Sequence, residues 1–156
     1  MASPNLSKTQ LLKTLEDLSR LALELKSSFI LPSILLLNGE LGAGKTALTK
    51  KIASHYGFAE NFVKSPSYSL INIYKNDQVQ INHLDFYRLN RHDQFLYNEL
   101  EELALMPNAL TIIEWPDRLN LKPLLAQAKQ VLQVNLSLKN QDEITFRQIE
   151  IHDKSS

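Results

Sequence analysis

The sequence has no cysteine, only four glycines, no excess of either charge and no long uninterrupted apolar run. Without cysteine, the chain cannot form disulfides, thiolate zinc sites or a cysteine nucleophile. Seventeen basic and seventeen acidic side chains cancel, so no global field draws nucleic acid or a membrane surface to the protein. The longest apolar stretch, residues 29–37, is broken by Pro32 and Ser33 and is not a membrane span. We expect a cytoplasmic protein that contacts RNA locally or through a partner.

Length and composition indicate one globular domain. With 156 residues and 44% hydrophobic content, the chain can bury a single sizeable core. Its first residues, Met1 to Asn5, lack the basic and then apolar pattern of a signal peptide. We therefore expect one domain over residues 1–156, with short flexible termini at about residues 1–5 and 152–156.

Three of the four glycines fall in one eight-residue stretch, Gly39–Thr46, which reads Gly-Glu-Leu-Gly-Ala-Gly-Lys-Thr. This stretch fits the phosphate-binding pattern G-x-x-x-x-G-K-[ST] at every fixed position. A loop that surrounds phosphate oxygens with backbone N–H groups needs glycine, because its main chain approaches the ligand closely and visits positive φ angles. A nucleoside triphosphate is therefore the first ligand to consider.

The residues of this stretch, which we call the phosphate loop, have distinct expected roles. The residues whose backbone would surround the phosphates are Glu40, Leu41, Gly42, Ala43 and Gly44. Lys45 would place its ammonium against the β and γ phosphates, and Thr46 would offer its hydroxyl to Mg²⁺. An apolar strand over residues 33–38 and a helix over residues 46–53 flank the loop, as a phosphate-binding strand, loop and helix require.

The rest of the chain alternates between helix and strand patterns. An amphipathic helix is predicted over residues 7–27, beginning at a capping box at Ser7. The other predicted helices cover residues 92–105 and 124–130, and the other predicted strands lie within residues 63–74, 79–84, 110–113, 132–138 and 144–151. In the 92–105 helix, the side chains expected to face inward are Phe95, Leu96, Leu100 and Leu103. We expect an α/β fold, a P-loop NTPase domain with a mostly parallel central sheet, antiparallel additions and helices on both faces.

Two carboxylates, Asp85 and Glu114, each end an apolar strand pattern. In open α/β sheets, ligands bind at the carboxyl ends of the strands, so we expect both side chains beside the phosphate loop. Nucleotide hydrolysis needs a Mg²⁺ and a positioned water in addition to the loop. Thr46, Asp85 and Glu114 are therefore the candidate metal ligands, and the spacing leaves open which carboxylate touches Mg²⁺ directly.

For several other polar and aromatic residues, the sequence allows both a functional and a purely structural role. Ser65 and Ser67 offer hydroxyls where switch segments of nucleotide hydrolases sense the γ phosphate, and we expect Ser67 to act there, with a plain turn as the alternative. His83 is either a polar relay or a satisfied structural residue. Arg88 pairs with phosphate or with a nearby acid, and Trp115 stacks on a ring or fills the core.

These pieces together resemble the TsaE family, bacterial P-loop ATPases that serve in forming threonylcarbamoyladenosine (t6A) in tRNA. The resemblance rests on Gly39–Thr46, Val63–Leu70, His83–Leu89 and Ile113–Pro116, which occur in the family's order. A P-loop alone is generic. Its combination with a His-x-Asp-x-Tyr-Arg pattern and a Glu-Trp-Pro pattern is specific.

The resemblance implies that Lys45 binds phosphate, that Thr46 and Glu114 bind Mg²⁺, and that Asp85 is needed for hydrolysis. It implies ATP and Mg²⁺ as ligands and two protein partners: TsaD, which transfers the threonylcarbamoyl group onto tRNA adenosine, and its companion TsaB. ATP turnover would reset the TsaB and TsaD complex between rounds, so contact with tRNA would be indirect. The chain departs from the family at Ser67 and Ser69, where threonine is usual.

Three other functions stay open on the residues alone. A small-molecule kinase would need an acceptor pocket and usually a lid that supplies arginines. The arginines of this chain show no cluster in sequence and lie at positions 20, 88, 91, 118 and 147. A regulatory GTPase would carry an Asn-Lys-x-Asp sequence, which the chain lacks. A binding module without hydrolysis would keep the phosphate loop and leave Asp85 without a catalytic role.

Overall fold

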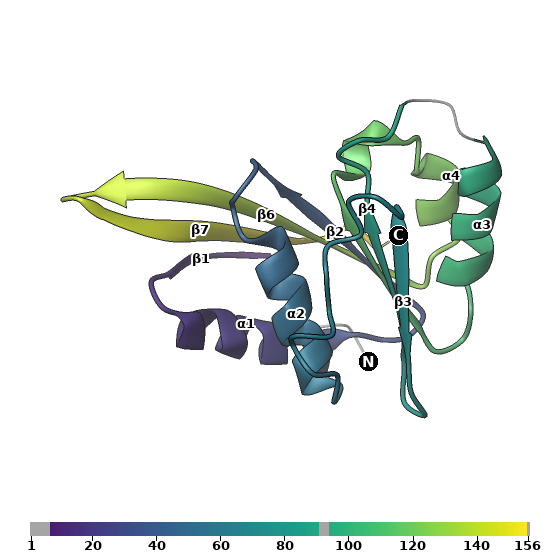
Figure 1. The fold of residues 1–156 in the computed structure, drawn as a ribbon, viewed down its shortest axis with the longest axis horizontal. Helices are drawn as coiled ribbons and strands as arrows, with labels where there is room; N and C mark the ends of the chain where they lie inside the picture. Colours follow the sequence, from purple (N-terminus) through teal and green to yellow (C-terminus); the bar gives the residue numbers. More distant parts are fainter. Residues whose placement is uncertain (1–6, 91–93, 156) are drawn as a thin grey trace.

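One seven-stranded sheet runs through the described part of the molecule (Figure 1). The structure is a computed structural model and describes residues 7–90 and 94–155. The strands are β1 (Lys8–Leu12), β2 (Ser33–Gly39), β3 (Ile71–Lys75), β4 (Gln80–Asp85), β5 (Ala109–Glu114), β6 (Gln130–Gln141) and β7 (Ile144–Asp153). The helices are α1 (Leu15–Ser28), α2 (Lys45–His55), α3 (Gln94–Ala104) and α4 (Lys122–Leu125), with a 3-10 turn at Pro116–Arg118.

The centre of the sheet is parallel. The strand order is β1-β7-β6-β2-β5-β4-β3, in which β6, β2, β5 and β4 run parallel and the remaining pairs are antiparallel. In the register, Glu114 lies opposite both Leu37 of β2 and Asp85 of β4. The carboxyl ends of β2, β4 and β5 therefore meet at one edge of the sheet, where α/β folds bind ligands.

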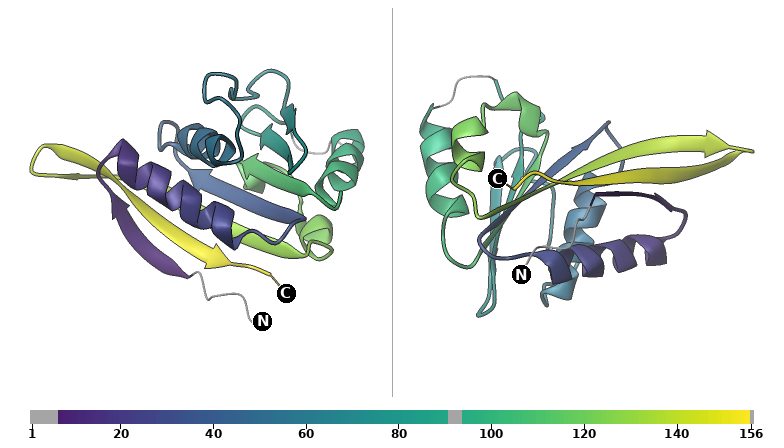
Figure 2. Two further views of the ribbon diagram at one scale, coloured as in Figure 1. Left: turned by 90° about the horizontal axis from the view of Figure 1, so that it is seen from below. Right: turned by 180° about the vertical axis from the view of Figure 1, so that it is seen from behind.

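Helices cover both faces of this sheet (Figures 1 and 2). Leu35 and Leu37 of β2 belong to the core under α1 and α2, whereas Ile34 and Leu36 belong to the core under α3 and α4. Burial on both faces explains why β2 is apolar at successive positions. The α/β class, the mixed sheet and the helices on both faces are as the sequence predicts. No helix within the described ranges is long and apolar enough to cross a bilayer.

The prediction of one helix over residues 7–27 is wrong at its beginning. The first residues form β1, which pairs antiparallel with β7, and α1 follows Thr14 as its N-cap. The Thr14 hydroxyl accepts a hydrogen bond from the Asp17 backbone N–H at 3.0 Å. In return, the backbone N–H groups of Lys13 and Thr14 donate to the Asp17 carboxylate and hold its pKa below the usual value. The capping box thus lies at Thr14, and pairing with β7 outweighs the helical pattern before it.

Thr14→Ala is expected to lower the free energy of unfolding by about 1 kcal/mol, because it leaves an N-terminal N–H of α1 without its acceptor. Ser7→Ala, at the helix start predicted from sequence, is the matched control and is expected to change it by less than about 0.5 kcal/mol. Urea unfolding of the two variants and the wild type measures the difference. Equal losses in both variants would contradict the cap at Thr14.

Two other predicted helices also differ from the structure. In α3, Leu96 and Leu100 are buried as predicted, but Phe95 is 80% exposed, since the buried stripe runs through Leu96, Leu100 and Ala104 at a spacing of four. Residues 92–93 of that predicted helix lie outside the described residues. The helix predicted over 124–130 is only one turn, α4, and Gln130 begins β6 instead. The buried Gln130 side chain accepts hydrogen bonds from the Ile30 backbone N–H, before β2, and from the Ser33 hydroxyl at the start of β2.

The β6–β7 hairpin projects from the body of the molecule (Figure 1). Strand β2 pairs with β6 only over Gln130–Leu136, so the rest of β6 pairs with β7 alone. Asp142 and Glu143 make the tip and both have left-handed φ angles, of 49° and 64°, which suit a two-residue hairpin turn. We call residues 137–148 the arm. Since β7 continues to Asp153, residues 152 and 153 belong to a strand rather than to the predicted flexible tail, and residues 1–5 of the other tail lie outside the described residues.

Candidate functional site

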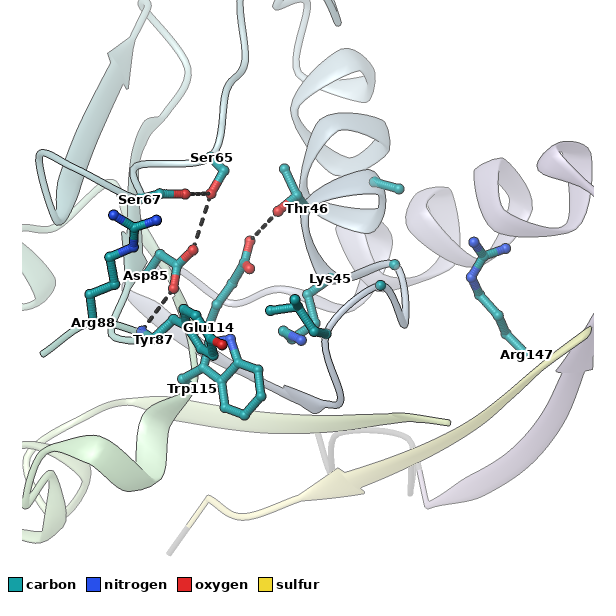
Figure 3. Close-up of a pocket in the computed structure, with 14 residues that line it drawn as sticks. Lys45, Thr46, Ser65, Ser67, Asp85, Tyr87, Arg88, Glu114, Trp115 and Arg147 are labelled. Atoms are coloured by element: carbon teal, nitrogen blue, oxygen red, sulfur yellow. Dashed lines mark hydrogen bonds between the residues drawn. The ribbon is translucent and has the colours of Figure 1, made fainter. Parts of the chain in front are cut away.

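A pocket of about 530 Å³ lies where β2, β4 and β5 end (Figure 3). Its lining comes from segments far apart in sequence: Leu41, Gly42, Gly44, Lys45, Thr46, Ala47, Ser65, Ser67, Asp85, Tyr87, Arg88, Glu114, Trp115 and Arg147. The structure therefore brings Lys45, Thr46, Ser67, Asp85 and Glu114 together, along with Leu41, Gly42 and Gly44. Of the predicted site residues, Glu40 and Ala43 are outside this lining.

The phosphate loop has the backbone that its glycines allow. Gly42 and Gly44 have φ angles of +81° and +106°, a region that favours glycine. A Cβ on Gly42 would meet no heavy atom within 4 Å, so the loop is open beside this residue. Helix α2 begins at Lys45, and its first backbone N–H groups have no acceptor inside the helix. An open loop that ends in a helix N-terminus is suited to bind an anion.

The Lys45 ammonium lies inside the phosphate loop. Its Nζ donates to the carbonyl oxygens of Gly39 at 2.6 Å and Glu40 at 2.9 Å and lies 4.4 Å from the centre of the Trp115 ring. The residue is only 5% exposed, and this burial lowers the pKa of Lys45, against the opposing effect of the Glu114 charge. Glu40, which is outside the pocket lining, thus takes part by holding the lysine.

Glu114 is fixed toward Thr46 by two contacts. Its Oε1 accepts a hydrogen bond from the Thr46 hydroxyl at 3.0 Å, and His83 Nε2 lies 2.8 Å from the same oxygen. His83 and Glu114 are 0% and 3% exposed. Because a carboxylate accepts, His83 Nε2 is the donor, and Nδ1 has no hydrogen-bond partner in the described part of the chain. His83 therefore orients Glu114 through one ring nitrogen. This arrangement matches neither alternative from the sequence, a polar relay or a fully satisfied structural residue, because Nδ1 has no partner among the described residues.

Asp85 is bound to a different part of the pocket. Its Oδ1 accepts the Tyr87 backbone N–H at 2.9 Å, and its Oδ2 accepts the Ser65 hydroxyl at 3.1 Å. The hydroxyl oxygens of Ser65 and Ser67 are 2.8 Å apart, so Ser67 is connected to Asp85 through Ser65 (Figure 3). The two carboxylates therefore differ in their neighbours: Glu114 contacts Thr46, and Asp85 contacts residues 65–67, which we call the serine loop.

Local sequence patterns leave open the roles of several other residues that line the pocket. Trp115 lines the pocket, and its ring centre is 5.1 Å from that of Tyr87. Trp115 directly follows the end of β5 and Tyr87 lies two residues after the end of β4, so the strand-end rule could have indicated both. Arg88 lines the pocket and lies 4.8 Å from the Tyr68 ring centre. Arg147 comes from β7, and no local pattern connects it to the phosphate loop.

A family model and several curated relatives that are similar in sequence all carry the same family name. A family model described as threonylcarbamoyl adenosine biosynthesis protein TsaE matches residues 12–149. The tRNA threonylcarbamoyladenosine biosynthesis protein TsaE of Synechocystis sp. is 37% identical over 98 residues, and the match spans only 62% of that relative's length. The protein of the same name from Rickettsia felis is 36% identical over 126 residues, which are 79% of this chain and 72% of the relative.

A solved structure shares the fold. The crystal structure of Bacillus subtilis YdiB superposes with a TM-score of 0.68, covering 96% of this chain and 86% of that one. At 22% sequence identity, this similarity is evidence for the fold alone. It supports the mixed α/β architecture described above.

Proposed function

This chain belongs to the TsaE family, and from that premise we propose that it is a Mg²⁺-dependent ATPase that serves t6A formation in tRNA. The observation that carries the proposal is the convergence of Lys45, Thr46, Asp85 and Glu114 on one pocket at the carboxyl edge of the sheet. A cation, a hydroxyl and two carboxylates around an open phosphate loop are the groups that nucleotide hydrolysis requires.

The phosphate loop would bind the phosphate tail of ATP. Backbone N–H groups of the loop and of the α2 N-terminus would donate to the phosphate oxygens. In this structure, the Lys45 ammonium donates hydrogen bonds to the neutral carbonyl oxygens of Gly39 and Glu40. When ATP binds, the ammonium would exchange these acceptors for the negatively charged β and γ phosphates. Its burial favours this exchange, because a buried cation gains most from an anionic partner.

Thr46 and Glu114 fit a Mg²⁺ site. The described residues contain no group of three or more His, Cys, Asp or Glu side chains that could hold a metal by themselves. Mg²⁺ at nucleotide sites, however, is held by one or two protein oxygens together with phosphate oxygens and waters. The Thr46 hydroxyl and the Glu114 carboxylate provide adjacent hard oxygens, and His83 would keep the carboxylate oriented. When bound there, the ion would neutralise charge that develops on the phosphates.

Asp85 would act on the attacking water. Its carboxylate accepts a hydrogen bond from Ser65 and not from Thr46, so it faces the serine loop. This loop would sense the γ phosphate. Asp85 would accept a proton from the water as the water oxygen forms the new bond to the γ phosphorus, and would later release it to solvent. The bond from that phosphorus to the β–γ bridging oxygen would break, and ADP and inorganic phosphate would leave.

The proposed partners are the TsaD and TsaB homologues of the same cell, with tRNA reached through them in the cytoplasm. Equal numbers of basic and acidic side chains support this indirect role, because a protein that binds tRNA by itself usually carries a net positive charge. Hydrolysis would reset the partner complex after each round of modification.

Reconstitution of t6A formation with TsaB, TsaD and tRNA tests the function. Modification is expected to continue beyond the first round only when this chain and ATP are both present, and the partner pair is expected to raise ADP formation. Equal yields with and without the chain would rule out the role. ADP formation that needs a small-molecule acceptor, and not the partner pair, would favour the kinase alternative.

A further inference from the structure

Arg147 contacts the phosphate loop from the opposite end of the sequence. It lies in the arm, on β7, and its Nε donates a hydrogen bond to the backbone carbonyl of Ala43 at 2.9 Å. In the described part of the chain, this is the single hydrogen bond of its guanidinium, and no carboxylate pairs with it. Figure 3 shows Arg147 across the phosphate loop from Asp85 and Glu114. The charged Arg147 side chain therefore donates its hydrogen bond to a single peptide group of the phosphate loop, that between Ala43 and Gly44.

The hydrogen bond determines the direction of a neighbouring N–H group. In a trans peptide, the carbonyl of one residue and the N–H of the next point in opposite directions. Because Arg147 holds the Ala43 carbonyl, the Gly44 N–H is directed away from the arginine, toward the other side of the loop. The positively charged guanidinium, bound at the Ala43 carbonyl oxygen, also polarises the Ala43–Gly44 peptide. This polarisation makes the Gly44 N–H a stronger donor to an anion.

The contact with Arg147 requires glycine at position 44. A Cβ on Gly44 would lie 2.8 Å from Arg147 Nε, so the arginine packs directly on the glycine backbone. The φ angle of Gly44, +106°, is one that other residues rarely adopt. The close approach and the left-handed backbone thus occur at the same residue, and a rotated Ala43–Gly44 peptide would lose the hydrogen bond from Arg147.

The other strand of the arm also contacts the loop. The Leu138 backbone N–H donates to Glu40 Oε1 at 3.4 Å, and Leu138 lies opposite Arg147 in the β6–β7 register. Both contacts come from the base of the arm, beyond the point where β2 stops pairing with β6. The phosphate loop is therefore held at Glu40 and at Ala43 by one hairpin.

We propose that Arg147 is a positioning residue for the phosphate loop: it fixes the Ala43–Gly44 peptide so that the Gly44 N–H is available to a phosphate, and it thereby sets nucleotide affinity. The inference rests on the proposed nucleotide-binding function. The arm would then have a function in nucleotide binding, in addition to its structural role in the sheet.

Nucleotide affinity is the first test. Arg147→Met keeps an apolar stem and removes the donor, and Lys139→Met is the matched control, since it removes a cation from the opposite face of the same arm. The fluorescence of Trp115, the only tryptophan and a pocket residue, reports binding. We expect Arg147→Met to weaken ADP and ATP alike, by about tenfold, because both share the phosphates held by the loop backbone. The control is expected to stay within about twofold of the wild type.

The second test needs no nucleotide. Labelling glycine with ¹⁵N gives backbone amide signals from four residues, and three of these, Gly39, Gly42 and Gly44, lie in the phosphate loop. Arg147→Met is expected to shift the Gly44 signal and leave the signal of Gly57, which follows the end of α2, in place. A folded variant with four sharp signals shows that the change is local.

The outcomes separate the two proposals. Unchanged ADP and ATP affinity in Arg147→Met, or an unmoved Gly44 signal, overturns the positioning role while the wild type still binds nucleotide. A loss confined to ATP also overturns it, because that result would indicate direct contact with the γ phosphate. If the wild type binds neither nucleotide, the proposed function fails as well.

Discussion

Lys45→Ala is expected to abolish sustained t6A formation in the reconstituted reaction and to lower ADP release by about a thousandfold. The lysine is the cation placed inside the phosphate loop, and its replacement removes the counter-charge expected to contact the β and γ phosphates directly. ADP release per chain and modified tRNA per TsaD, measured over many cycles, are the two readouts.

Lys50→Ala is the matched control for this prediction. Lys50 lies on the same helix, α2, away from the pocket lining, so the substitution removes the same charge from the same element. Its ADP release is expected to stay within about twofold of the wild type. Equal loss in both variants would attribute the effect to α2 stability, and full activity of Lys45→Ala would refute the ATPase assignment.

Glu114→Gln and Asp85→Asn are expected to fail in different ways. Glu114 contacts Thr46, so replacing its charge is expected to remove most of the gain in ATP affinity that Mg²⁺ provides. Asp85 is bonded to the serine loop, so Asp85→Asn is expected to keep Mg²⁺-dependent ATP binding and to lower hydrolysis by about a hundredfold or more. Each variant exchanges one carboxylate oxygen for an amide nitrogen, so the two serve as controls for one another.

Two measurements distinguish the variants: ATP affinity over a series of Mg²⁺ concentrations, and ADP release at saturating ATP and Mg²⁺. Loss of Mg²⁺ dependence in Asp85→Asn with retention in Glu114→Gln would reverse the assignment of the two carboxylates. Identical behaviour of both variants would mean that both hold the ion, the alternative that the strand-end pattern alone leaves open.

The sequence is sufficient to predict the parts of the site that local patterns encode. The glycines and Lys45 of the phosphate loop form a contiguous motif, and Asp85 and Glu114 are polar residues at the ends of apolar strands. The parallel register then brings the two carboxylates beside each other, with Asp85 opposite Glu114. A motif and a general rule for α/β sheets thus lead to the same pocket before any coordinates are considered.

The features that the sequence does not reveal depend on contacts between distant segments. Strand β1 exists because β7 offers it an edge, and the five residues concerned also fit the start of a helix. His83 orients Glu114 from 31 positions away, and Arg147 reaches Ala43 from 104 positions away. Such pairs leave no periodic signal, because neither partner constrains the residues next to the other.

Beyond Leu136, β6 has an unpaired edge, since β7 is its neighbour on one side and none of the strands in residues 7–90 and 94–155 pairs with it on the other. A free row of N–H and C=O groups invites another chain to add a strand and can start aggregation. Here the edge is short, and it carries the charge of Lys139 and ends at the acidic pair Asp142 and Glu143. These charges disfavour edge-to-edge pairing of identical molecules, because each added strand would bring like charges together.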